Sequence, residues 1–283
     1  MSEPGAPSPE PPRRSWADLG PRLASAVVLI PLTALTLYVG GFVFAAVVGI
    51  VFALAYREWE TMVALRPPDA IGFVQIALVV LAGLAYPQWG AAGTAVVIAI
   101  ACVIAVVLGG EGRLWRIGGL VFFGIVMVSI LALRGTGPDG IAAGVVLGAT
   151  IWVTDSAAFF TGRQIGGEKL APDISPSKTW SGALGGLALG TAAGFSVFIA
   201  VGGAPWYIGL VLCLVTSILG QLGDLGESAI KRRFRIKDSG DIIPGHGGFM
   251  DRMDSLTFGA IFVFLVGLIH SGYGDVAAGF LHW

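Results

Sequence analysis

Apolar residues follow one another along this chain in nine long segments, which are separated by charged residues, glycine pairs or prolines. A helix needs roughly 20 mainly apolar residues to cross the hydrocarbon core of a bilayer, and these segments approach that length. The pattern therefore predicts an all-α, polytopic integral membrane protein with about nine transmembrane helices. The expected spans cover residues 23–39, 42–56, 71–86, 91–109, 117–133, 141–161, 182–202, 206–229 and 255–272.

Composition agrees with a membrane protein, because 55% of the 283 residues are hydrophobic and only 12% are charged. Residues 1–22 differ from the rest, being polar and rich in proline, and we expect a disordered tail rather than a removed signal peptide. The remainder divides into about five N-terminal transmembrane helices (23–140) and a C-terminal, candidate catalytic region of about four helices (141–283). Only Gly40 and Gly41 separate the first two spans, which could form one bent helix.

Basic residues alternate between the connections of the predicted spans. Lys and Arg are enriched in cytoplasmic loops, and the second, fourth, sixth and eighth connections all contain them, whereas the other connections contain Arg134 alone. This alternation predicts a multi-pass protein of the inner (plasma) membrane whose even-numbered connections face the cytoplasm. Arg13, Arg14 and Arg22 of the tail would then face outward, against the rule. The formal net charge of −1 does not favour polyanion binding, and we expect no nucleic-acid partner.

Four glycines recur at every fourth position of the seventh span, at Gly182, Gly186, Gly190 and Gly194. A helix face without side chains lets a neighbouring backbone approach closely. We interpret the face as a packing surface, with a substrate groove as the alternative. Glycine-rich faces of this kind also make a homodimer a reasonable expectation.

Polar residues share one face of the eighth span where it leaves the membrane. Their spacings of three or four residues align them on a helix. An intramembrane aspartate such as Asp224 is a functional-site hypothesis, and its natural partners are a metal ion or a basic side chain. A structural ion pair of Asp224 with Lys231 or with a neighbouring helix is the alternative. The aligned residues are Gln221, Asp224, Ser228, Lys231 and Arg235.

The loop after this helix combines basic residues, carboxylates and a glycine turn. Glycine N–H groups can bind phosphate oxygens, carboxylates suit Mg²⁺ that is shared with substrate phosphates, and basic groups suit polyphosphate charge. Asp254 could instead cap the ninth span, and Asp238 could pair with a basic neighbour or support a metal indirectly. The candidates are Arg232, Lys237, Asp238, His246, Gly247, Gly248, Asp251, Arg252 and Asp254.

A second polar loop, residues 155–182, is predicted on the same side of the membrane. Asp155 lies near the end of a span, and Ser175 and Lys178 shortly precede the seventh span, where helix N–H groups favour anions. An ordinary capped loop is the alternative. Two such loops on one membrane face together predict a phosphate-and-metal site between them.

These motifs resemble the bacterial phosphatidate cytidylyltransferases, also called CDP-diacylglycerol synthases. Residues 228–254 match the signature of that family without a gap, and the resemblance covers residues 150–260 by motif. The chain departs from the family at Ser181, where members commonly carry an acidic residue. The matching positions are Ser228, Ile230, Lys231, Arg232, Lys237, Asp238, Gly240, Ile243, Pro244, His246, Gly247, Gly248, Phe249, Asp251, Arg252, Met253 and Asp254.

The resemblance implies a membrane enzyme of phospholipid biosynthesis that joins CTP to phosphatidate, releases pyrophosphate and leaves CDP-diacylglycerol in the bilayer. It implies a site facing the cytoplasm and Mg²⁺ as cofactor, with room for a second cation such as K⁺. By motif position, Asp224 and Asp251 are the implied metal ligands and, together with Ser228 and Lys231, the implied catalytic residues. Substrate binding is implied for Lys178, Ser175, Arg232, Lys237, His246, Gly247, Gly248 and Arg252, with support from Asp155, Asp238 and Asp254.

Three other functions are compatible with parts of the pattern. Another CTP-dependent membrane lipid transferase, or a polyprenol kinase-like enzyme, would share the metal and phosphate chemistry and differ in its product. A CDP-alcohol phosphotransferase fits less well, because its spacing of aspartates is missing. A transporter would have broken helices that meet at the midplane in related halves, whereas the charges here gather at one face.

Overall fold

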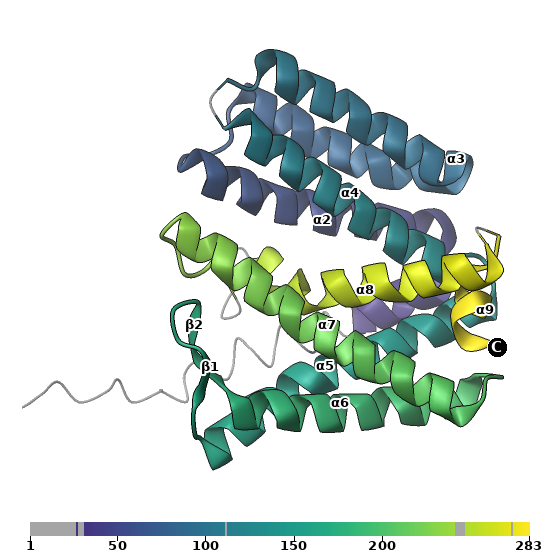
Figure 1. Cartoon of the computed structure of the whole chain (residues 1–283). Helices are drawn as coiled ribbons and strands as arrows, with labels where there is room; N and C mark the ends of the chain where they lie inside the picture. Colours follow the sequence, from purple (N-terminus) through teal and green to yellow (C-terminus); the bar gives the residue numbers. More distant parts are fainter. Residues whose placement is uncertain (1–26, 28–30, 111, 241–246, 273) are drawn as a thin grey trace, which may run out of the picture.

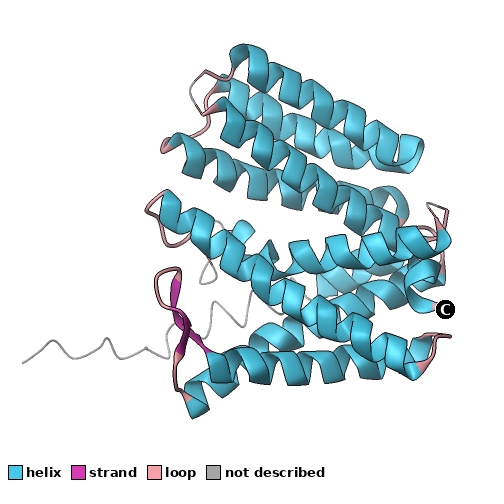
Figure 2. Cartoon of the chain, in the orientation of Figure 1, coloured by secondary structure: helices cyan, strands magenta, loops and turns pink. Residues whose placement is uncertain are grey.

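The structure is a computed structural model, and it describes residues 27, 31–110, 112–240, 247–272 and 274–283. The expected disordered tail lies outside these residues. Helices dominate the part that is described, and two short strands accompany them (Figures 1 and 2). Residues 31–39 are helical, and the remaining elements in chain order are α2 (Gly41–Ala64), α3 (Ala70–Leu108), α4 (Arg113–Arg134), α5 (Pro138–Ile165), β1 (Lys169–Ala171), β2 (Ser175–Thr179), α6 (Trp180–Val201), α7 (Trp206–Arg233), α8 (Met250–Ser271) and α9 (Val276–Leu281).

Seven of these helices, α2 to α8, are long and apolar enough to cross a membrane. They coincide with the expected spans from 42–56 onward, and the helical residues 31–39 fall within the first expected span. Gly40 ends that first helix with φ 66° and ψ −156°, so the first two spans are separate helices. The prediction of an all-α, polytopic protein with about nine helices is therefore confirmed. The short helix α9 was not predicted.

α3 reverses its direction in the middle, although its residues are helical on both sides. Gly90 has φ 61° and ψ −156°, and Pro87 lies one turn earlier. The Thr94 hydroxyl donates to the Ala82 carbonyl at 2.9 Å across 12 residues, whereas 12 residues of straight helix would cover about 18 Å. The element is thus a helical hairpin, and its two arms are the separate spans predicted for residues 71–86 and 91–109.

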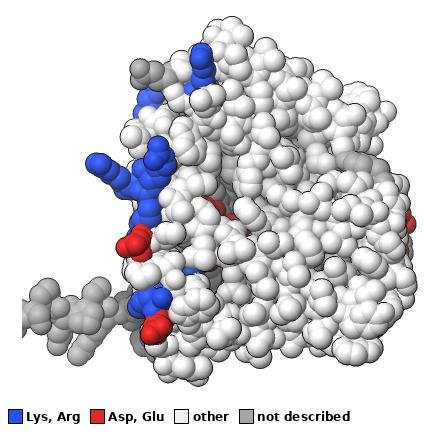
Figure 3. Space-filling model, viewed as in Figure 1, with Lys and Arg blue, Asp and Glu red and all other residues white. Residues whose placement is uncertain are grey.

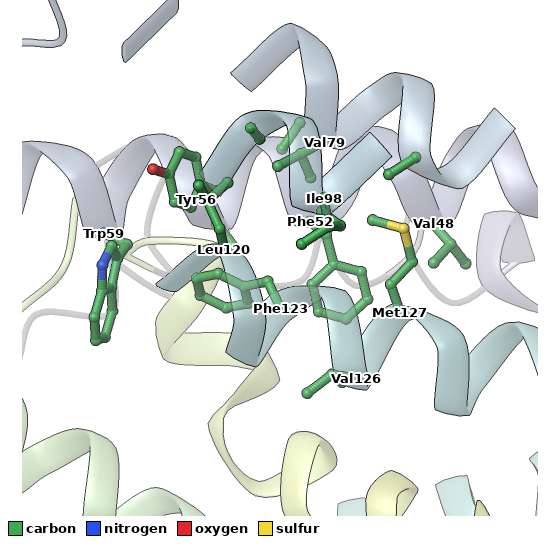
Figure 4. Packing of buried hydrophobic residues seen from close by; sticks show 14 of the residues in the cluster. Val48, Phe52, Tyr56, Trp59, Val79, Ile98, Leu120, Phe123, Val126 and Met127 are labelled. Carbon is green, nitrogen blue, oxygen red and sulfur yellow. The ribbon is translucent and has the colours of Figure 1, made fainter. Parts of the chain in front are cut away.

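The N-terminal helices α2, α3 and α4 pack around one cluster of apolar side chains, of which Figure 4 shows the central members. The ring centroids of Phe52 and Phe123 lie 6.0 Å apart. The buried Tyr56 hydroxyl donates to Gln75 Oε1 at 2.8 Å, which pairs two polar groups that would be costly alone. Met250, the first residue of α8, belongs to the same cluster. The start of α8 is therefore packed against the N-terminal helices.

The glycine face of α6 packs against α5. Gly182, Gly186, Gly190 and Gly194 are all buried, and a methyl group on any of them would come too close to α5 atoms, such as the Ala158 carbonyl or the hydroxyls of Thr150 and Thr154. The predicted packing role is confirmed. Because α5 of the same chain covers this face, it gives no support to a homodimer, which stays an untested expectation.

Replacing Gly190 with alanine should lower the apparent unfolding temperature in detergent. The added methyl group would overlap Thr154 Oγ1, which lies 2.7 Å from Ser217 Oγ on α7, and overpacking of this kind costs about 1–3 kcal/mol. Gly118→Ala on α4 is the matched control, because a Cβ there meets nothing within 4 Å. An unchanged unfolding temperature for Gly190→Ala would show that the two helices can separate without penalty.

Lys and Arg side chains gather at one end of the helix bundle, on the left edge of the molecule in Figure 3. The exception predicted from the sequence, Arg134, is buried and donates to the carbonyl oxygens of Leu37, Tyr38, Gly135 and Gly137. Its guanidinium therefore serves as a cap for the end of the first helix. The connections that contain Lys and Arg therefore lie at one end of the bundle, which we call the basic end.

Candidate functional site

The second polar loop folds into a β-hairpin at the basic end, which the sequence analysis did not predict. Strands β1 and β2 pair antiparallel, with Lys169 opposite Thr179 and Ala171 opposite Ser175. Figure 2 shows this hairpin beside the C-terminal end of α7. Arg232 of α7 reaches it, because its Nε donates to the Ile174 carbonyl at 3.1 Å. The two polar loops are thus brought together.

Thr179 and Ser181 fix the junction between this hairpin and α6. The Thr179 hydroxyl caps α6 by accepting the Gly182 N–H at 3.1 Å. The Ser181 hydroxyl donates to the Gly166 carbonyl and lies 3.1 Å from Thr179 Oγ1. An ionised carboxylate cannot donate a hydrogen bond, so an acidic residue at position 181 would need a different partner.

Lys178 and Asp224 form an ion pair across the two loops. Lys178 Nζ on β2 lies 2.7 Å from Asp224 Oδ2 on α7, and the side chains are 24% and 30% exposed. Both face an open cavity of about 840 Å³ that is bounded by α5, α6, α7, α8 and the hairpin. A partly exposed pair at a cavity can exchange one partner for a charged ligand at little cost in stability.

The cavity carries both signs of charge in equal number. Four carboxylates and four basic side chains line it, together with polar and small residues such as Gln221, Ser177 and Gly182. The predicted site residues among them are Asp155, Lys178, Asp224, Asp251, Arg252 and Asp254, and the basic residues not predicted for the site are Arg163 and Lys169. Such a surface can bind a polyphosphate through its basic groups and a cation through its carboxylates.

Asp251, in the first turn of α8, is held by several donors. Its Oδ1 lies 2.6 Å from Lys231 Nζ. Its Oδ2 accepts from the Ser239 N–H at 3.0 Å, the Ser239 hydroxyl at 2.9 Å and the Gly248 N–H at 3.1 Å. Because three residues donate to it, the carboxylate has a fixed position at the wall of the cavity.

Lys231 lies behind the cavity wall rather than on it. It is buried, and its ammonium binds Asp251 and Glu227, the latter at 3.0 Å. Glu227 was not predicted as a site residue, although its spacing of four residues from Lys231 is typical of a helical ion pair. The second carboxylate lets Lys231 stay neutralised if Asp251 turns toward a ligand.

Two further carboxylates meet at Ser255 on α8. The Ser255 hydroxyl lies 3.1 Å from Asp155 Oδ1 of α5 and 3.4 Å from Asp254 Oδ1. The Ser255 N–H also donates to Asp254 Oδ1 at 2.7 Å. Asp254 is inside α8, which begins at Met250, so the alternative in which it caps that helix is wrong.

The remaining predicted residues lie away from the cavity or outside the described chain. Ser228 and Arg232 are on α7 without lining the cavity, and Ser175 is a buried strand residue. Lys237 and Asp238 are exposed after α7. Gly247 adopts φ 81°, which favours glycine, and precedes the Gly248 N–H that binds Asp251. His246 lies outside the described residues.

The carboxylates of the cavity are hard oxygen donors of the kind that Mg²⁺ prefers. Among the residues that the structure describes, no group of three or more His, Cys, Asp or Glu side chains is arranged to hold a metal ion by itself. Mg²⁺ is commonly bound by one or two carboxylates and completed by water and substrate phosphates. The donor set therefore fits a magnesium ion that binds together with a phosphate ligand.

Comparison with known proteins places most of this chain in one family. The model of the cytidylyltransferase family matches residues 21–270. A phosphatidate cytidylyltransferase of Brucella suis biovar 1 (strain 1330) is 40% identical over 257 residues, which cover 89% of this chain and 94% of that protein. A protein of the same name from Bacillus subtilis (strain 168) is 45% identical over 117 residues, which cover 41% of this chain and 44% of that protein. Another from Haemophilus influenzae is 44% identical over 113 residues, which cover 38% of this chain and 39% of that protein. The resemblance seen in the motifs is confirmed, and the chain belongs to the cytidylyltransferase family.

Proposed function

We propose that this protein transfers the cytidylyl group of CTP to phosphatidate, which gives CDP-diacylglycerol and pyrophosphate. Two observations support the proposal. The relatives that cover most of the chain are named phosphatidate cytidylyltransferase, and the cavity offers basic groups and carboxylates at the end of a membrane bundle. The mixed charge of this cavity is the main support, because both reactants are anionic phosphates, which basic groups can bind directly and carboxylates can bind through a cation.

In this reaction an oxygen of the lipid phosphate attacks the α-phosphorus of CTP. A new P–O bond forms, and the bond between the α-phosphorus and the bridging oxygen of the β-phosphate breaks, so pyrophosphate leaves with that electron pair. No protein nucleophile is needed, since the lipid phosphate is already an anion. Catalysis can then rest on positioning and on stabilisation of the charge that develops on the leaving group.

The basic residues of the cavity are assigned to the phosphates. Lys178 and Arg252 were expected to bind substrate from their motif positions, and Arg163 and Lys169 line the same cavity. Lys178 can release Asp224 and bind a phosphate oxygen, because its ion pair is partly exposed. This exchange would free the Asp224 carboxylate at the moment when the nucleotide enters.

Asp224 and Asp251 are the carboxylates that would hold a magnesium ion, with Asp155 and Asp254 beside them on the cavity wall. The bound ion would screen the repulsion between the two phosphate substrates and polarise the phosphoryl oxygens. Ser239 and the Gly248 N–H keep Asp251 oriented for this role. Lys231 neutralises Asp251 when no ligand is bound.

We further propose that the basic end faces the cytoplasm of the inner membrane. The positive-inside rule supports this orientation, since Lys and Arg gather at that end in Figure 3. The same end carries the cavity, which is lined by residues of the hairpin and of the C-terminal half of α7. CTP would then reach the site from the cytoplasm and phosphatidate from the bilayer.

The test is an assay of the purified protein in detergent with CTP, phosphatidate and Mg²⁺. We expect pyrophosphate and CDP-diacylglycerol to appear in equal amounts. Diacylglycerol and a polyprenol, offered in place of phosphatidate, separate the proposal from the kinase-like alternative. Folded protein that forms neither product from phosphatidate would refute the proposed function.

A further inference from the structure

Glu58 of α2 is a buried carboxylate that neither polar loop contains. It lies near the end of the second span and is 2% exposed. Its oxygens accept from the N–H groups of Phe249 and Met250, each at 2.9 Å, and from the Ser239 hydroxyl at 2.9 Å. All three donors belong to the catalytic region of the chain, between 181 and 192 residues away.

These contacts make Glu58 the cap of α8. The first N–H groups of a helix have no partner within the helix, and the N-cap residue Phe249 offers no side-chain acceptor. A carboxylate is favourable at this position, because it also interacts with the positive end of the helix dipole. The start of α8 is therefore held by a side chain from α2, only one residue before Asp251.

Ser239 joins Glu58 to Asp251. Its hydroxyl lies 2.9 Å from Glu58 Oε2 and 2.9 Å from Asp251 Oδ2, and a hydroxyl has a single hydrogen to donate. The two carboxylates thus share one donor. If Asp251 turns toward a cation, the hydroxyl can donate fully to Glu58, so no buried carboxylate loses its partner.

Gly248 leaves the space that this arrangement needs. A Cβ at position 248 would overlap both Ser239 Oγ and the Glu58 carboxylate. A Cβ on Gly240 would come within 3.1 Å of Glu58 Oε1. Gly240 and Gly248 therefore leave room for the Glu58 carboxylate to reach the backbone of α8.

We infer that Glu58 is a positioning residue of the active site, which fixes Asp251 through the start of α8 and through Ser239. The inference rests on the proposed role of Asp251. It means that the N-terminal helices supply part of the catalytic geometry, although no residue of α2 lines the described cavity. A purely structural cap would affect how much protein folds, whereas a positioning residue also sets the turnover of each folded molecule.

The experiment compares Glu58→Gln, Ser239→Ala and their combination in the full-length protein, purified in detergent. We expect kcat to fall about 10- to 100-fold in each single variant, as for residues that orient a metal ligand. Because both act through Asp251, the combined variant should lose no more than about three times the larger single effect, within the range of coupled neighbours. The folded fraction from size-exclusion chromatography normalises each rate.

Glu60→Gln is the matched control. Glu60 is two residues further along α2 and equally buried, but its partner is Arg116 in the N-terminal helices. We expect this variant to unfold at a lower temperature and to keep the wild-type kcat per folded molecule. Three results would overturn the inference. The first is wild-type kcat in folded Glu58→Gln, the second is a combined variant whose loss equals the product of the two single losses, and the third is an equal loss of kcat in Glu60→Gln. If Glu58→Gln does not fold, wild-type kcat in folded Ser239→Ala would overturn the inference. An inactive wild-type protein would instead contradict the proposed function.

Discussion

Asp251→Asn should lower kcat by about 100- to 1000-fold, the range seen when one group that stabilises the transition state is removed. The wild-type carboxylate binds Lys231 and is oriented by Ser239 and the Gly248 N–H. An amide has one acceptor oxygen in place of two and carries no charge for a cation. Steady-state rates of pyrophosphate release, measured over a range of Mg²⁺ concentrations, test the prediction.

The fold should survive this change. Lys231 keeps Glu227 as a partner at 3.0 Å, so its buried ammonium is still neutralised by one carboxylate. Asp173→Asn is the matched control, since Asp173 is exposed in the turn between β1 and β2 and does not line the cavity. Near-normal turnover by folded Asp251→Asn would refute the assigned role.

Lys178→Gln should raise the KM for CTP by about 10- to 100-fold, which corresponds to the loss of one hydrogen bond to a charged group. The ammonium is 24% exposed at the cavity and has only to exchange Asp224 for a phosphate oxygen. The unfolding temperature should change little, because partly exposed ion pairs contribute roughly 0–1 kcal/mol. Initial rates at varied CTP and saturating phosphatidate give the KM.

Two comparisons sharpen this result. Arg66→Gln removes a basic residue of another basic connection, whose partner Asp69 is outside the cavity, and its KM should stay at the wild-type value. Asp224→Asn should lower kcat more than it raises KM, since the carboxylate is assigned to the metal. An unchanged KM in Lys178→Gln would exclude Lys178 from nucleotide binding.

The membrane spans could be predicted because each depends on a local property, the length of an apolar segment. Even the hairpin within α3 follows from Gly90 and Pro87, which interrupt that segment at its centre. The glycine face of α6 was predictable for the same reason, since the spacing of four residues fixes one side of a helix. Both features can be predicted from local sequence, without knowing which distant segments they contact.

The candidate site was predicted only in part, because several of its contacts join distant segments. The sequence pattern predicts Asp224, Asp251 and Lys178 as site residues, because each is a charged residue within or next to an apolar span. Glu58 does not, since it stands in a charged stretch at the end of α2 where a carboxylate could simply face water, and its partners are more than 180 residues away. The hairpin of β1 and β2 was missed because its strands of three and five residues have no alternating apolar pattern.

Helical spacing also predicts which residues share a face without predicting how deep they lie. Asp224 faces the cavity, whereas Lys231, two turns later on the same face, is buried beneath α8. Arg235 was expected to continue that face, but α7 ends at Arg233, and Arg235 has φ 58°. The prediction for Arg235 is therefore wrong, because the helix ends before it.

The contacts of Arg134 have a consequence for the order in which the chain assembles during synthesis. Arg134 binds the carbonyls of Leu37 and Tyr38 from 97 and 96 residues further along the chain. N-terminal segments are made first, so residues 31–39 are synthesised before the guanidinium that binds the carbonyls at the end of their helix. Carbonyl groups without partners are costly in hydrocarbon. The helix of residues 31–39 can therefore gain this cap only after the end of α4 has been made.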